Sequence, residues 1–310
     1  MIDRKHTVRS WSPILLTLIA CDPVEGYHKH LHSQFLGWGF ERGYYDTENG
    51  RVAYWVKRTG EQEPLVLLHG FGGNGTVTWY RILGRLSKDR PMLIPDLLWF
   101  GESHSMAAPT LSAQSDAVQS ILQQMAWEKY DLLGTSYGGF VALALVERHS
   151  LPIDQLFLVD SPGPYFSSED IEALHQRFGV NNIHEILVPQ NPKGVQNLID
   201  ICYYKKGPSV PMPILASEYK RSFAKYHNEK RMLLDDLISR RMPLKSTMSP
   251  IEQVHVYWGE FDRIFPLSSS KAIAERFQAD ITVFPNAAHA PYIQYPQRFV
   301  AHLMDDLNTE

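Results

Sequence analysis

The chain has 310 residues, of which 44% are hydrophobic and 21% are charged, and its formal net charge is −4. This length and apolar content suffice for one large core or two small ones. The charges form neither a basic stripe nor an acidic tail, which excludes the usual nucleic-acid-binding surfaces. No run of about 18 or more apolar residues occurs, so no segment is expected to span a bilayer as a helix.

The first 21 residues have the layout of a secretory signal, with a basic segment, a short apolar run and a small residue before a break. The stretch from Leu18 to Cys21 resembles the lipobox of bacterial lipoproteins, in which the cysteine is acylated and becomes the new N-terminus. That resemblance implies lipidation of Cys21 and, with Asp22 beside it, retention at the inner membrane of a bacterial cell envelope. The alternative is an ordinary N-terminal helix of a cytoplasmic enzyme.

Cysteine occurs at two positions, Cys21 and Cys202. An acylated Cys21 would leave Cys202 without a disulfide partner, so the fold is not expected to depend on a disulfide. Cys202 lies in the apolar stretch LIDICYY and is expected to pack as a small hydrophobic side chain.

Apolar runs of strand length alternate with segments of helical periodicity along most of the chain. Asn49-Gly50 is a turn signal that predicts a β-hairpin. The predicted strands are the hairpin over residues 43–58 and single strands over 64–70, 91–96, 130–133, 154–160, 254–259 and 281–284. Helices are predicted between the single strands and at the end of the chain. This alternation indicates an α/β class with a mostly parallel sheet and helices on both faces.

One region interrupts the alternation. Residues 163–250 contain helical patterns and Pro-rich or polar joints, but no convincing strand. Because this region lies between two predicted strands, we expect a helical lid inserted into a core formed by residues 40–162 and 251–310.

The strongest local motif is Gly134-Thr135-Ser136-Tyr137-Gly138, which follows a predicted strand and opens a predicted helix. A strand-to-helix turn this tight strains its middle residue and requires small flanking residues, here Gly134 and Gly138. The turn presents the Ser136 hydroxyl at the carboxyl edge of the sheet. The Tyr137 N–H, at the start of the helix, would face an oxyanion formed beside that hydroxyl.

A nucleophilic serine needs a base, and the base needs an orienting carboxylate. His289 follows the last predicted strand and Asp262 follows the strand before it, so both are expected at the same edge as Ser136. The chain order serine, aspartate, histidine is the one expected for such a sheet. Glu260 and Asp160 compete with Asp262 for the acid role, because both also follow strands.

The motif HGFGG, which follows the strand over 64–70, can supply a second oxyanion donor. Gly70 and Gly72 let the backbone approach a substrate, and the Phe71 N–H can join that of Tyr137. His69 is expected to be structural rather than the base.

Five motifs together resemble the α/β-hydrolase family over nearly the whole chain from about residue 43. They are HGFGG (69–73), PDLLWFGES (95–103), GTSYGG (134–139), WGEFDRIFP (258–266) and NAAHAP (286–291). This resemblance implies an α/β-hydrolase fold with a mostly parallel eight-stranded sheet and a helical cap inserted after the sixth strand.

Within the family, the chain resembles bacterial lipases and esterases of the Moraxella and Psychrobacter type and the monoacylglycerol lipases similar to them. Tyr137 stands where such lipases often have methionine, so the acyl pocket is expected to differ. Phe166 in the cap could help to enclose an acyl chain.

We therefore expect a serine carboxylic-ester hydrolase that acts on a small-molecule ester or lipid. Ser136 argues against epoxide hydrolases and haloalkane dehalogenases, which place aspartate at this position. A carbon–carbon bond hydrolase and a non-catalytic ligand-binding homologue remain alternatives. No cofactor and no metal is expected, because the histidines lack metal-ligand spacing. If Cys21 is acylated, the protein would associate with a membrane.

Overall fold

The computed structural model describes residues 22–86, 88–239 and 251–308. Cys21 lies outside these residues, so its lipidation and the localisation that depends on it remain predictions. Among the described helices, none combines the length and the apolar character that crossing a membrane requires.

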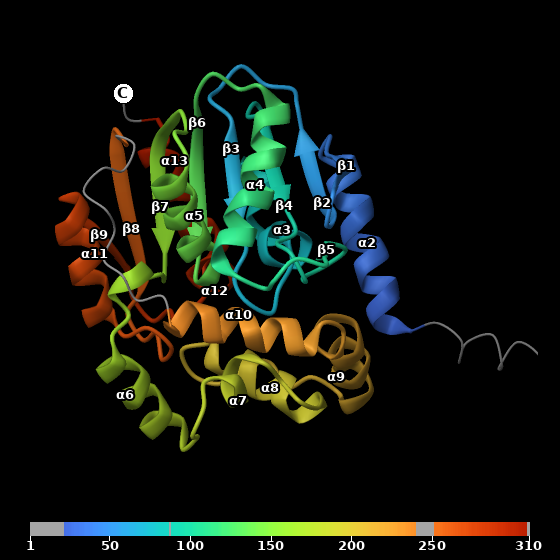
Figure 1. Cartoon of the computed structure of the whole chain (residues 1–310), viewed down its shortest axis with the longest axis vertical. Helices are drawn as coiled ribbons and strands as arrows, with labels where there is room; N and C mark the ends of the chain where they lie inside the picture. Colours follow the sequence, from blue (N-terminus) through green and yellow to red (C-terminus); the bar gives the residue numbers. More distant parts are fainter. Residues whose placement is uncertain (1–21, 87, 240–250, 309–310) are drawn as a thin grey trace, which may run out of the picture.

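A nine-stranded sheet forms the centre of the described structure and has helices on both faces (Figure 1). The strand order is β1-β2-β4-β3-β6-β7-β8-β9, and β5 pairs with β2 beside this row. The strands are β1 (Glu41–Thr47), β2 (Gly50–Lys57), β3 (Leu65–Leu68), β4 (Met92–Pro95), β5 (His104–Ser105), β6 (Tyr130–Thr135), β7 (Ile153–Val159), β8 (Gln253–Gly259) and β9 (Ile281–Phe284). The pairs from β4 through β9 in this row are parallel, which confirms the predicted α/β class.

Two sets of helices accompany the sheet. The helices that alternate with the strands are α2 (Pro23–Gly37), α3 (Gly75–Leu86), α4 (Leu111–Met125), α5 (Tyr137–Arg148), α11 (Ser270–Phe277), preceded by the turn η3 (Leu267–Ser269), α12 (Pro291–Gln294) and α13 (Pro296–Asp306). The helices between β7 and β8 are η1 (Gly163–Tyr165), α6 (Ser168–Phe178), α7 (His184–Leu187), α8 (Pro192–Ile201), α9 (Met212–Glu218), the π-helix η2 (Tyr219–Ala224) and α10 (His227–Ser239).

Strand β3 shows why the central strands read as continuous apolar runs. Its four residues are fully buried, and their side chains alternate between the two faces of the sheet. Val66 and Leu68 belong to the core cluster that includes residues of α4 and α5. Leu65 and Leu67 belong to the cluster that includes residues of α3 and α13. Both faces are therefore covered by helices, as the sequence predicted.

The hairpin β1–β2 is present, but its turn differs from the predicted one. Thr47 pairs with Gly50, so Glu48 and Asn49 are the two turn residues. Gly50 is required for another reason, because a Cβ atom there would lie 2.2 Å from the His104 carbonyl oxygen of β5. Close approach of β5, rather than turn geometry, explains this glycine.

The number of strands also differs slightly from the prediction. Eight strands form the main row, and the ninth is the two-residue β5. A two-residue strand carries no periodicity that a sequence pattern could reveal.

The inserted helices follow β7, which is the sixth strand of the main row in chain order. Figure 1 shows α10 lying across one end of the sheet, with α7, α8 and α9 on its outer side. Residues 240–250 lie outside the described residues, so the end of this segment at residue 250 stays a prediction.

A buried lysine joins the inserted helices to the core. Lys230 of α10 is 2% exposed, and its Nζ donates a hydrogen bond to the Lys225 carbonyl at 2.5 Å. The same atom lies 5.4 Å from the ring centroid of Phe100, which belongs to the core, and 5.8 Å from that of Tyr226. Burial lowers the pKa of Lys230 to about 8, because the charged ammonium loses its water.

The turn between β6 and α5 has the strained geometry that its sequence predicts. Ser136 has a φ of 51°, in the left-handed region that non-glycine residues rarely adopt. A Cβ atom on Gly134 would lie 2.4 Å from the Gly138 carbonyl oxygen, and one on Gly138 would lie 2.3 Å from the Leu68 carbonyl oxygen. The backbone leaves room only for glycine at both flanks.

We expect Gly134→Ala to lower the free energy of unfolding by about 1–3 kcal/mol, because the backbone must move to admit the methyl group. Gly26→Ala is the matched control, since Gly26 lies within α2 and has no atom within 4 Å of the added Cβ. That substitution should raise the free energy of unfolding by about 0.5–1 kcal/mol. Urea unfolding followed by circular dichroism measures both changes. Equal effects at the two positions would contradict the crowding at Gly134.

The buried Lys230 predicts a pH dependence of stability. Between about pH 8 and 10.5 the unfolded chain keeps the Lys230 proton while the folded protein loses it. Stability should therefore rise with pH across this window, by at most about 1.4 kcal/mol per pH unit. Lys230→Met should flatten this rise, and Lys220→Met, at an exposed position, should not. The prediction would be contradicted if the free energy of unfolding rose equally with pH in the wild-type protein and in Lys230→Met.

Candidate active site

Ser136 stands at the carboxyl end of β6, in the turn that leads into α5. Its N–H donates to the Val159 carbonyl at 2.8 Å, which ties the turn to the neighbouring strand β7. Ser136 is partly exposed, whereas the residues on either side of it are buried. Its hydroxyl is thus held by a rigid backbone and stays within reach of a small molecule.

The three residues predicted to act together lie in hydrogen-bond contact. Nε2 of His289 is 2.8 Å from Oγ of Ser136, and Nδ1 of His289 is 2.7 Å from Oδ2 of Asp262. Oδ1 of Asp262 accepts hydrogen bonds from the N–H groups of Ile264 at 2.8 Å and Phe265 at 3.1 Å. The carboxylate therefore holds the hydrogen on Nδ1, which leaves Nε2 free to accept the hydroxyl proton.

The loops that carry the acid and the base are joined to each other. Asp262 follows β8 and His289 follows β9, as the sequence predicted. The Phe261 N–H donates to the Ala287 carbonyl at 2.8 Å, across these two loops. The spacing of Asp262 and His289 is therefore set by backbone contacts as well as by their own hydrogen bond.

Glu260 is placed away from the imidazole. Its side chain is exposed, and Oε2 accepts a hydrogen bond from the Asn286 N–H at 3.0 Å. Of the two competing acids, only Asp160 lies beside the predicted pair.

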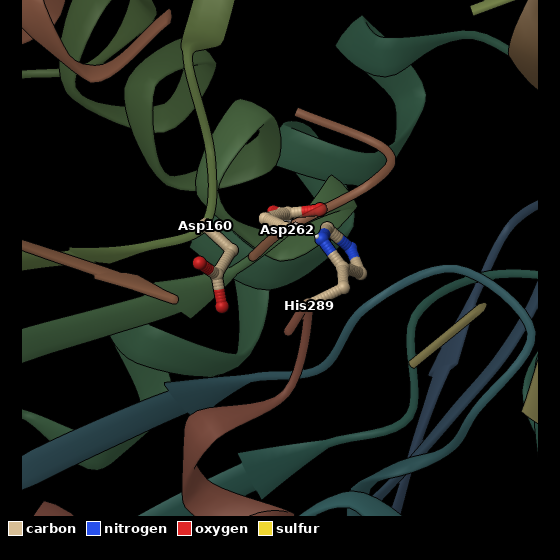
Figure 2. Close-up of side chains that lie close together, drawn as sticks. All are labelled: Asp160, Asp262 and His289. Atoms are coloured by element: carbon tan, nitrogen blue, oxygen red, sulfur yellow. Dashed lines mark hydrogen bonds and ion pairs between the residues drawn. The ribbon is translucent and has the colours of Figure 1, made fainter. Parts of the chain in front are cut away.

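Figure 2 shows Asp160, Asp262 and His289 close together, and one possible ligand atom from each lies within 4.8 Å of the others. Carboxylates and imidazole are metal ligands in many proteins, so these three groups have the chemistry of a metal site. Both ring nitrogens of His289 are engaged, one with Asp262 and the other with Ser136. The hydrogen-bonded set explains the cluster without a metal ion.

The environment of Asp160 differs sharply from that of Asp262. Asp160 is fully buried, and its Oδ1 accepts a hydrogen bond from the Gly259 N–H at 2.7 Å. Burial, followed by the nearby charge of Asp262, raises the pKa of Asp160 well above its ordinary value. Cys202 lies in the same electrostatic environment, and burial raises the pKa of its thiol to about 12. This thiol is therefore neutral near neutral pH.

The HGFGG loop passes directly beside the nucleophile. A Cβ atom on Gly70 would lie 3.2 Å from Cβ of Ser136, and Gly72 has a φ of +80°. The Phe71 ring packs edge-on against the Tyr137 ring, with centroids 5.5 Å apart. The Tyr137 N–H is at the first position of α5, where the helix offers it no acceptor. Phe71 and Tyr137, the two residues predicted to supply the oxyanion donors, thus lie in contact with each other next to Ser136.

His69 holds the loop and does not face the serine. Its Nε2 accepts a hydrogen bond from the Leu97 N–H at 2.9 Å, and its Nδ1 lies 2.8 Å from the Gly70 carbonyl oxygen. With both nitrogens engaged in a fully buried position, His69 connects the ends of β3 and β4.

An aromatic wall extends from the imidazole toward the inserted helices. The centroid of the Phe265 ring lies 5.5 Å from that of His289, 4.8 Å from that of Phe166 and 5.9 Å from that of Phe140. The aromatic wall consists of these three phenylalanines. Phe166 was predicted as a pocket residue, whereas Phe265 was missed. Its place three residues after Asp262 was the available sequence signal.

Comparisons with known proteins agree with the fold and the motifs. A family model described as alpha/beta hydrolase fold matches residues 63–296. The 2-hydroxymuconate semialdehyde hydrolase of Pseudomonas sp. (strain CF600) is 27% identical over 259 residues, which cover 79% of this chain and 86% of that protein. Lipase 1 of Psychrobacter immobilis is 28% identical over 257 residues, which cover 80% of this chain and 75% of the lipase.

A solved structure shows the same architecture over almost the full length. The crystal structure of a membrane phospholipase A, described as a bacterial virulence factor, superposes with a TM-score of 0.74 at 22% identity. The superposition covers 96% of this chain and 97% of the other. The match of the family model over most of the chain, with this strand order, shows that the chain belongs to the alpha/beta hydrolase family.

Proposed function

We propose that the chain is a serine hydrolase that cleaves carboxylic esters through an acyl-enzyme intermediate. The observation that carries this proposal is the continuous set of hydrogen bonds from Ser136 through His289 to Asp262, at 2.8 and 2.7 Å. These distances lie within the range in which a general base can take a proton from a nucleophile.

In the first half of the reaction, Ser136 Oγ attacks the ester carbonyl carbon while its proton moves to Nε2 of His289. Asp262 stabilises the imidazolium that forms and keeps the ring in place. The carbonyl oxygen becomes an oxyanion, which the N–H groups of Phe71 and Tyr137 stabilise. The imidazolium then gives its proton to the departing alcohol, and the acyl group remains on the serine.

In the second half, a water molecule takes the place of the alcohol. His289 removes a proton from this water, which attacks the acyl carbon, and the carboxylic acid leaves as Ser136 recovers its proton. The same donors stabilise the second oxyanion. Every group that these steps require is a side chain or N–H of the described residues.

The apolar surroundings of the imidazole support the proposed substrate class. The aromatic wall of Phe265, Phe166 and Phe140 favours contact with an acyl chain over contact with a charged group. A small-molecule ester or a lipid fits this environment, and the similarity to a bacterial lipase supports it.

A carbon–carbon bond hydrolase is the second candidate. The observation that favours it is the similarity to a Pseudomonas hydrolase whose name indicates a semialdehyde substrate. Such a substrate is anionic, and burial of its carboxylate against aromatic rings without a partner would be unfavourable.

Ser136→Ala should slow hydrolysis of p-nitrophenyl butyrate by at least about 10⁴-fold, because the nucleophile is lost. It should also abolish labelling by a fluorophosphonate probe. Ser120→Ala is the control, since Ser120 lies on α4 and its hydroxyl donates a hydrogen bond to the Asp116 carbonyl of the same helix. Unchanged ester hydrolysis in Ser136→Ala would refute the proposed mechanism, and failure of the wild-type protein to label would favour a non-catalytic role.

The two enzymatic candidates differ in substrate preference. We expect the kcat/KM for p-nitrophenyl butyrate to exceed that for 2-hydroxymuconate semialdehyde by at least about tenfold, because the aromatic wall leaves a carboxylate unpaired. Spectrophotometric assays of both substrates on one protein preparation give this ratio. A ratio below one would replace the ester hydrolase with the carbon–carbon bond hydrolase.

A further inference from the structure

Two buried carboxyl groups stand beside one imidazole, and the mechanism uses only one of them. Asp262 follows β8 and Asp160 follows β7, so each comes from the carboxyl end of a parallel strand. Possible ligand atoms of Asp160, Asp262 and His289 all lie within 4.8 Å of one another (Figure 2). Asp160 is therefore near enough to His289 to act on its charge.

The two carboxyl groups differ in the hydrogen bonds that they receive. Asp262 receives three hydrogen bonds, from the N–H groups of Ile264 and Phe265 and from Nδ1 of His289. Asp160 receives one, from Gly259, and its Oδ2 is buried without a hydrogen-bond partner among the described residues. Burial, together with the nearby carboxylate of Asp262, raises the pKa of Asp160, and one hydrogen bond does little to offset this. Of the two carboxyl groups, Asp160 thus has the surroundings that favour the neutral, protonated form.

The position of Asp160 is also fixed by the backbone. Its φ is 47°, in the left-handed region, and its own N–H donates to the Tyr257 carbonyl at 2.9 Å. Gly259, which donates to its side chain, is packed so closely that a Cβ atom there would lie 2.0 Å from the Ala288 carbonyl oxygen. These contacts hold the Asp160 carboxyl group close to Asp262 and His289.

We propose that Asp160 is a reserve acid: a neutral carboxylic acid in the resting protein that ionises and becomes the counter-ion of His289 when Asp262 cannot carry a charge. This inference rests on the proposed function, because it concerns the same imidazole. The covalent change is a single proton transfer: the O–H bond of the Asp160 carboxylic acid breaks, and a water molecule accepts the proton and forms the new O–H bond.

The other titratable groups near Asp160 do not compete for this role. Cys202 and Tyr292 both interact with Asp160 electrostatically, and burial raises the pKa of each, so both are neutral near neutral pH. Arg263 contributes a positive charge near Cys202, but one of its nitrogens already donates to the Asp200 carbonyl at 2.5 Å. Asp262 and His289 are the remaining partners.

A double-mutant cycle on Asp160→Asn and Asp262→Asn tests the proposal. The rate of fluorophosphonate labelling is the readout, because it reports the nucleophilicity of Ser136 whatever the natural substrate is. Asp160→Asn alone should slow labelling by less than about fivefold, because the amide keeps an acceptor for Gly259. The same substitution in the Asp262→Asn background should slow it by at least a further tenfold.

The outcomes separate the two proposals. If the wild-type protein does not label, the proposed function fails. If it labels and Asp160→Asn has the same effect in both backgrounds, the reserve acid fails. A loss of 100-fold or more in correctly folded Asp160→Asn alone would show that Asp160 already works in the resting protein, and would overturn its neutrality.

Two further measurements depend on charge rather than on structure. The first is the pH dependence of the labelling rate. The acid limb, the low-pH range over which the rate falls, should lie at the same pH in Asp160→Asn as in the wild-type protein. Removal of a negative charge beside the imidazole would instead move this limb to lower pH and contradict the proposal. The second is the infrared difference spectrum between the wild-type protein and Asp262→Asn, which tests the proposal without a substitution at Asp160. It should show the loss of a protonated-carboxyl band, and a spectrum without that loss would overturn the reserve acid.

Discussion

The hydrogen bond between Ser136 Oγ and His289 Nε2 is the contact on which the site depends. A serine hydroxyl is a weak nucleophile unless a base takes its proton, and an imidazole serves as that base only in the correct tautomer. Asp262 fixes the tautomer through Nδ1, and backbone N–H groups fix Asp262 in turn. The distances leave little freedom to any of the three side chains.

The topology of the sheet explains how residues so far apart in sequence meet. Ser136, Asp262 and His289 each follow a parallel strand, and the carboxyl ends of such strands lie at one edge of the sheet. The inserted helices leave the sheet after β7 and lie across one of its ends (Figure 1). Two residues of these helices, Leu198 and Phe223, lie next to Gly72 of the HGFGG loop, so the insertion meets the loop that passes beside Ser136.

The sequence predicted the parts of the fold that local pattern determines. Continuous apolar runs located β3 and β4, and glycine spacing located the turn around Ser136. Features that depend on contacts between distant segments could not be predicted from the sequence pattern. The two-residue β5 has no periodicity, and the Gly50 requirement arises from contact with β5. The sequence did place Asp160 after a strand, as a competitor for the acid role, and the pairing of β7 with β8 brings it close to Asp262. Phe265 became a site residue only through the position of the His289 ring.

The most direct test of the central claim is a crystal structure of the protein after reaction with a phosphonate ester. The phosphorus should be bonded to Ser136 Oγ, and its oxygen should lie about 2.7–3.1 Å from the N–H groups of Phe71 and Tyr137. A phosphonate attached to another residue, or one whose oxygen points away from both N–H groups, would contradict the proposed chemistry.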